Sequence, residues 1–95
     1  MVRAVRLFVP LTAGLEEFSV DVKSMTGKVM VIHQMTSESL VAELIYAVYK
    51  SEGIAPEQQR LIYNSKSTKP HEVLGELGIG AGSLLHMVLR LRGGM

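Results

Sequence analysis

Few side chains in this sequence could catalyse a reaction, and they are scattered along it. The three histidines, His33, His71 and His86, have no ligand-like spacing with acidic neighbours, so they do not predict a metal site. The absence of cysteine excludes a thiol nucleophile, a disulfide and a thiolate metal site. No serine lies in a nucleophile-elbow sequence. The sequence therefore predicts a protein that is not an enzyme and that holds no metal or other cofactor.

The glycines before the last apolar stretch do not predict a phosphate-binding site. A phosphate cradle follows a strand and opens a helix. The glycines here are instead spaced for a loop that precedes a strand: Gly75, Gly78, Gly80 and Gly82.

Residues 83–95 combine an alternating strand with a basic tail that closes on two glycines. A period of two divides side chains between two faces, so one face can enter a core while the other contacts water. Gly93 and Gly94 have no side chains, so we expect the chain there to be thin and able to enter a narrow channel. Such a tail is either a disordered terminus or a segment presented to other proteins. The two sets of alternating residues are Leu85, Met87, Leu89 and His86, Val88, Arg90.

Length and composition limit the function classes. Ninety-five residues make one domain with a single modest core, and an apolar fraction of 47% is ordinary for a folded chain. No apolar run is long enough for a membrane span, and a net charge of +1 does not favour nucleic-acid binding. We expect a monomer in the cytoplasm and nucleus, with neither a membrane nor a nucleic acid as partner.

Residues 1–17 form an extension with two interpretations. Arginines before an apolar run faintly resemble a secretory signal, but the run is short and Pro10 interrupts it. An extra edge strand is favoured because apolar residues alternate and proline is tolerated only at an edge; a disordered extension is the alternative. The alternating residues are Val5, Leu7, Val9 and Leu11.

The segment 18–53 predicts a hairpin followed by a helix. Alternation over 18–23, a turn at 24–28 with Gly27, and a β-branched run at 29–35 predict two strands. Ser39 is the expected N-cap and Gly53 the expected left-handed stop of the helix. The expected buried face of the helix is Val41, Leu44, Ile45 and Val48.

After Pro56 a short strand over 57–63 and a turn at Asn64-Ser65 complete the pattern. Strand, strand, helix, strand and a last strand predict an α+β fold of the β-grasp type, with a mixed sheet packed on one helix. The first and last strands are expected side by side at the centre of the sheet.

Three stretches resemble ubiquitin. These are the tail 89–94 with the strand 85–88 before it, the hairpin 18–28, and the segment 52–63. The alignment over 18–94 needs one extra residue near Gln34-Met35. The resemblance implies an extension at 1–17, a ubiquitin-like domain at 18–89 and a flexible tail at 90–95.

The resemblance also implies two surfaces through which other proteins read the chain. The partner-binding patch comprises Met25, Ile62, His86 and Val88, with methionine where the family has leucine. A secondary patch comprises Ile54, Leu89 and Leu91.

By resemblance, Gly93 and Gly94 are the point of conjugation to substrate lysines, and the activating-enzyme contacts are Arg60, Arg90 and Arg92. The cullin modifier, the closest relative of ubiquitin, carries alanine at the position of Arg90, so arginine predicts acceptance by the ubiquitin-type activating enzyme. Met95 leaves Gly94 inside a peptide bond, so a hydrolase must remove it first. The expected chain-acceptor lysines are Lys23, Lys28 and Lys66, while Ile45, Ala47 and Ala81 replace three others.

These residues favour a conjugated modifier whose partners are activating, conjugating and ligating enzymes, ubiquitin-binding domains and a deconjugating hydrolase. The alternative is a non-conjugated domain of a larger protein that docks on ubiquitin receptors or the proteasome. A β-grasp sulfur carrier is a third class, disfavoured by the matches at 61–63 and at His86.

Overall fold

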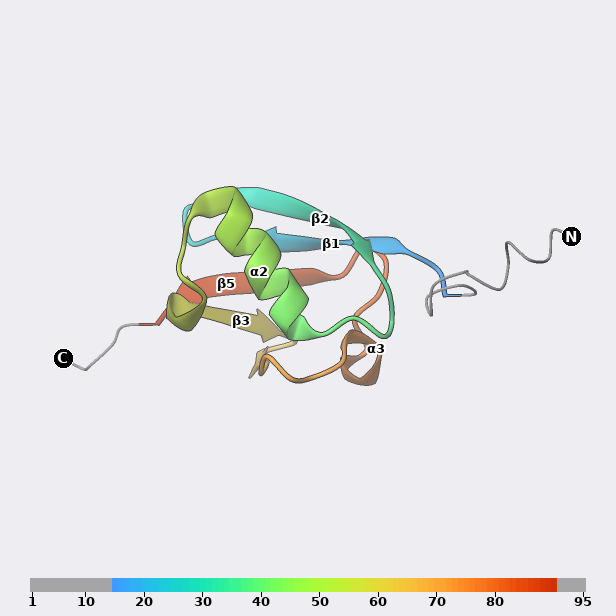
Figure 1. The fold of residues 1–95 in the computed structure, drawn as a ribbon. Coiled ribbons are helices and arrows are strands. Elements are labelled where there is room, and N and C mark those ends of the chain that lie inside the picture. Colours follow the sequence, from blue (N-terminus) through green and yellow to red (C-terminus); the bar gives the residue numbers. More distant parts are fainter. Residues whose placement is uncertain (1–14, 91–95) are drawn as a thin grey trace, which may run out of the picture.

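A five-stranded mixed sheet packs against one long helix (Figure 1). The computed structural model describes residues 15–90. The elements run in the order β1 (Phe18–Lys23), β2 (Val29–Met35), α2 (Val41–Glu52), a 3₁₀ turn η1 (Pro56–Gln58), β3 (Gln59–Tyr63), β4 (Lys66–Ser67), α3 (Leu74–Leu77) and β5 (Leu84–Leu89).

The strand order is β2-β1-β5-β3-β4, so the first and last strands do lie side by side. β1 pairs with β5 in parallel, and every other neighbouring pair is antiparallel. A parallel pair needs a long crossover connection, which α2 and the segments after it supply. The predicted β-grasp fold is confirmed.

The β1–β2 hairpin forms as predicted and contains one irregularity. Gly27 adopts φ +94° in the turn, and the Ser24 amide donates to the Lys28 carbonyl at 2.8 Å. Between Phe18 and Val20 the pairing register shifts, and Gln34 on β2 has φ +63°. This bulge lies at the position where the alignment with ubiquitin needs an extra residue.

The predicted N-cap of the helix is wrong by one residue. The cap is Leu40, whose amide donates to the Glu43 carboxylate at 3.1 Å. Ser39 is buried, and its hydroxyl accepts the Thr36 amide at 3.0 Å, closing the turn before the helix. Gly53 ends the helix as predicted, with φ +76° and its amide donating to the Tyr49 carbonyl at 2.8 Å.

The core lies between the sheet and α2. All four residues of the predicted helix face are buried, and they pack with the inward side chains of the strands and of the connection before β5. The members from outside the helix are Val20, Val22, Met30, Ile32, Met35, Leu61, Leu74, Ile79, Leu85 and Met87. No helix of residues 15–90 is long and apolar enough to cross a membrane.

The connection between β3 and β5 contains more structure than its glycines predict. Gly75 lies inside the short helix α3, which the sequence did not predict because one turn has too few residues for a helical period. Asn64 and Ser65 both have positive φ, as expected of the turn. The strand predicted over 57–63 begins only at Gln59, because Pro56 starts a 3₁₀ turn.

Along the last strand, the inward residues are buried only as far as Met87. Leu85 and Met87 are buried, but Leu89 is 48% exposed. Leu89 pairs with Gln59 at the start of β3 and lines a surface groove with Ile54, at the end of the sheet where the core stops.

Candidate functional site

The sheet face opposite α2 brings together three of the four predicted patch residues. Ile62 on β3 pairs directly with His86 on β5. Because Leu61 and Met87 point into the core, the strand period places Ile62, His86 and Val88 on the outer face. His86 is exposed, and Ile62 and Val88 are half-buried. This group of three is called the outer-face patch below.

Leu84 extends the outer-face patch, and sequence reasoning missed it. It lies two residues before His86 on β5 and is 41% exposed. Its alternation with His86 and Val88 was the available signal. On β1, Lys23 pairs with His86 and is exposed, so one predicted acceptor lysine lies at the border of the patch.

Met25 lies with the secondary patch. It is 67% exposed in the hairpin turn and lines a groove with Ile54 and Leu89. Leu91, the third predicted member of that patch, lies outside the described residues. The structure therefore joins Met25 to Ile54 and Leu89 in one apolar groove at the end of the sheet.

An ion pair borders this groove. The Lys28 ammonium contacts the Glu52 carboxylate at 2.7 Å, and both residues line the groove. The hydrogen bond from Lys28 lowers the pKa of Glu52 below its ordinary value. Residues so distant in sequence carry no local signal, so sequence reasoning did not find this pair. It means that Lys28, a predicted acceptor lysine, is engaged in the folded chain.

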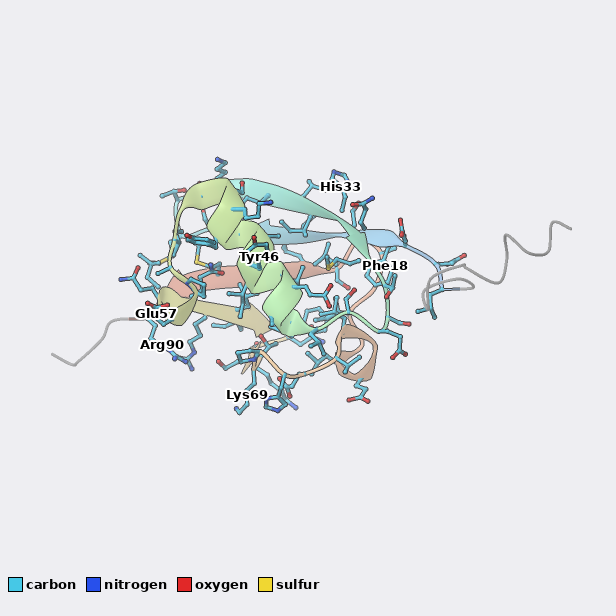
Figure 2. The ribbon with its side chains drawn as sticks, viewed as in Figure 1. Phe18, His33, Tyr46, Glu57, Lys69 and Arg90 are labelled. Carbon is cyan, nitrogen blue, oxygen red and sulfur yellow. The ribbon has the colours of Figure 1, made fainter. Side chains whose placement is uncertain are left out.

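Two of the three predicted arginines are described, and both are exposed near the end of β5. Arg60 pairs with Val88, and its Nε donates to the Ser67 hydroxyl at 2.9 Å. The Arg90 amide donates to the Gln58 carbonyl at 2.6 Å, which extends the β3–β5 pairing past the strand. Figure 2 shows Arg90 at this end, near Glu57 of the 3₁₀ turn. Arg92 lies outside the described residues, as do the conjugation and processing residues Gly93, Gly94 and Met95.

The structure also describes the third predicted acceptor lysine and a position where an acceptor lysine is replaced. Lys66 is exposed on the short strand β4, just after the Asn64-Ser65 turn. Ile45, which replaces an acceptor lysine, is 9% exposed and belongs to the core. Within residues 15–90 no group of three or more metal-binding side chains comes together.

A mixed sheet wrapped over one helix, with an apolar outer face and arginines at the end of the last strand, defines the ubiquitin-like β-grasp class. A sequence model of the ubiquitin family matches residues 20–92. The chain belongs to the ubiquitin family.

The chain aligns with nearly the full length of three relatives. The chain is 38% identical to the ubiquitin-like protein NEDD8 of Dictyostelium discoideum over 76 residues, which is 80% of this chain and 97% of the relative. It is 37% identical to ubiquitin-like protein 1 of Schizosaccharomyces pombe (79% and 95% covered). It is 36% identical to the NEDD8-like protein RUB1 of Saccharomyces cerevisiae (79% and 96% covered). These relatives place the chain among ubiquitin-like protein modifiers in general.

Proposed function

We propose that this chain is conjugated to substrate lysines through Gly94, after a hydrolase has removed Met95. The Gly94 carboxylate attacks the α-phosphate of ATP, giving an acyl adenylate and releasing pyrophosphate. An enzyme thiolate then displaces AMP to form a thioester. A substrate lysine amine attacks that thioester, an amide bond forms, and the thiol leaves. All catalytic groups belong to the partner enzymes, in the cytoplasm and nucleus.

The observation that carries this proposal is the position of Arg60 and Arg90. Both are exposed beside the point where the chain leaves the sheet toward the glycines. Guanidinium groups can form paired hydrogen bonds with carboxylates, so they suit an acidic surface of an activating enzyme. They also lie at one end of the outer-face patch, since Arg60 pairs with Val88.

Arg90 decides which activating enzyme we expect. The relatives carry NEDD8 or NEDD8-like names, whereas arginine at this position favours the ubiquitin-type enzyme. The test supplies chain ending at Gly94, with ATP, to each of the two activating enzymes and measures the reducible thioester on gels. We expect charging by the ubiquitin-type enzyme, and Arg90→Ala to reduce it by about tenfold or more.

Lys50→Ala is the matched control because it removes a cation from α2 and not from β3 or the end of β5, and this variant should be charged normally. No thioester with either enzyme, while the chain is folded, would contradict conjugation. Charging by the NEDD8-type enzyme alone would contradict the role given to Arg90.

The outer-face patch is proposed as the surface read by ubiquitin-binding domains. Its half-buried Ile62 can add apolar contact at the centre, while His86 supplies a polar edge. We expect Ile62→Ala to weaken binding to a ubiquitin-interacting helix by about tenfold or more with little loss of folding. Val31→Ala, on the outer face of β2, is the control. Unchanged affinity would remove the patch from the proposal.

The second candidate is a docking domain that is read by the same patch but never conjugated. It is favoured by Met95 after Gly94 and by residues 1–17, which have no counterpart in ubiquitin. Incubation of the full chain with hydrolases that cleave after ubiquitin's terminal glycine separates the candidates. Mass spectrometry should detect loss of Met95 if the chain is a conjugated modifier, and an intact chain favours docking.

A further inference from the structure

The apolar groove at the end of the sheet contains a methionine, Met25, whose side chain is open to solvent. It is 67% exposed. The other methionines of residues 15–90 are buried: Met30 is 6% exposed, Met35 8% and Met87 2%. A thioether is oxidised by peroxides where they can reach the sulfur. Accessibility therefore singles out Met25 within the part of the chain that the structure describes.

The hairpin turn that carries Met25 is closed by hydrogen bonds between its other residues. The Ser24 hydroxyl accepts the Thr26 amide at 3.3 Å and lies 2.8 Å from the Thr26 hydroxyl. The Gly27 amide donates to the Ser24 carbonyl at 3.0 Å. These bonds close the turn without the Met25 side chain, so a chemical change at its sulfur should leave the turn folded.

Oxidation of Met25 would change the chemistry of the groove. Met25 lines it together with the apolar side chains of Ile54 and Leu89. A methionine sulfoxide places a polar sulfur–oxygen group where an apolar thioether was. The Lys28 ammonium and the Thr26 hydroxyl line the same groove, and such groups can donate hydrogen bonds to a sulfoxide oxygen. The groove can therefore accommodate the oxidised side chain, but it is then less apolar.

We propose that Met25 is a site of reversible oxidation that changes this groove from an apolar to a polar state. The Met25 sulfur attacks one oxygen of hydrogen peroxide, a sulfur–oxygen bond forms and the O–O bond breaks. The proton on the transferred oxygen passes to the departing hydroxide, which leaves as water. Sulfur loses the two electrons that the peroxide gains.

The reverse step needs a methionine sulfoxide reductase. Two thiols of that enzyme supply the two electrons and become a disulfide, while the sulfoxide oxygen leaves as water. The proposal does not depend on conjugation, because Met25 belongs to the folded domain and not to the tail.

Two substitutions at this position separate the oxidation from other effects. The ubiquitin family has leucine here, and leucine has no atom that peroxide oxidises. Met25→Leu therefore keeps an apolar side chain of similar volume and removes the reaction. Met25→Gln introduces a polar side chain of similar length and so imitates the oxidised groove without peroxide.

The experiment treats the full chain with dilute hydrogen peroxide and follows each methionine by mass spectrometry of its peptides. We expect the Met25 sulfoxide to form at least about tenfold faster than the sulfoxides of the three buried methionines, which require opening of the core. The urea midpoint of unfolding should stay unchanged. The NMR signals of the Ile54 and Leu89 methyl groups should shift, and retention on a hydrophobic column should fall.

Reductases for both sulfoxide epimers should restore the original methyl signals and retention. Peroxide should change neither readout in Met25→Leu, and Met25→Gln should be retained less from the start. Oxidation of Met87 as fast as Met25 would overturn the proposal, as would unfolding of the oxidised chain. The same shifts in peroxide-treated Met25→Leu would also overturn it, because they would assign the effect to another residue.

Discussion

Gln34 has a backbone conformation that L-residues with side chains rarely adopt. Its φ of +63° accompanies the bulge that lets β2 turn toward the helix. A non-glycine residue in this region is strained by the approach of Cβ to its own backbone, at a cost of roughly 1 kcal/mol or more. The family resemblance located the extra residue, but only the folded chain shows that it is accommodated by a left-handed residue.

We expect Gln34→Gly to raise the free energy of unfolding by about 0.5–1 kcal/mol, because relief of strain exceeds the added entropy of glycine. Gln34→Val should lower it by about 1–2 kcal/mol, since a β-branched residue tolerates positive φ least. Urea unfolding measures both. A stabilising valine would contradict the assigned conformation.

Glu52 is the described carboxyl group whose pKa the fold lowers, through the hydrogen bond and charge of Lys28. A lowered folded pKa means that the pair stabilises the fold above the unfolded pKa. That contribution is lost as the pH falls through the folded pKa.

Lys28→Ala should therefore raise the pKa of Glu52 toward its ordinary value in an NMR titration of the side-chain carboxyl. Ser51→Ala should raise it less, since the Ser51 hydroxyl donates a longer bond of 3.3 Å. Lys23→Ala, on β1, should leave it unchanged. The pKa of Glu52 should also rise when Lys28 is conjugated, because the Lys28 ammonium then becomes an uncharged amide.

The element α3 is positioned by close backbone contact with the segment before α2. The Gly75 amide donates to the Ser37 carbonyl at 2.8 Å, and the Leu74 amide donates to the Ser39 carbonyl at 2.8 Å. A Cβ on Gly75 would lie 2.7 Å from the Ser37 carbonyl oxygen. Glycine at this position is required by space and not by its φ angle.

Gly75→Ala should lower the free energy of unfolding by about 1–2 kcal/mol, because overpacking outweighs the better helix propensity of alanine. Gly80→Ala is the matched control: nothing lies within 4 Å of its added Cβ, so the change should stay within about 0.5 kcal/mol. Thermal and urea unfolding compare the two. Equal effects would contradict the close approach.

For the whole molecule, α2 is the element that closes the core over the sheet. Its inward residues are buried, whereas Tyr46 and Tyr49 on the same helix are 57% and 44% exposed. Figure 2 shows Tyr46 on the helix, on the side away from the sheet. The helix therefore stabilises the fold through one face only.

Leu44→Ala should lower the free energy of unfolding by about 2–5 kcal/mol, a large part of the stability of a small domain. Tyr46→Ala should cost less than about 1 kcal/mol, mainly through loss of its contacts with Tyr49 and Lys50. If the two substitutions lowered the free energy of unfolding by comparable amounts, the assignment of Leu44 and not Tyr46 to the core would be wrong.

The sequence by itself determined the hairpin, the helix and its buried face, and the neighbouring first and last strands. These features follow from residue period, turn residues and resemblance, which act over short distances or along an alignment. It also identified Ile62, His86 and Val88, whose roles stay proposals. Only the tertiary structure decided the cap at Leu40, the helix α3, the end of the core at Met87 and the Lys28–Glu52 pair. Each of these depends on contacts between residues that are distant in sequence or on where the core ends, and no local pattern encodes such contacts.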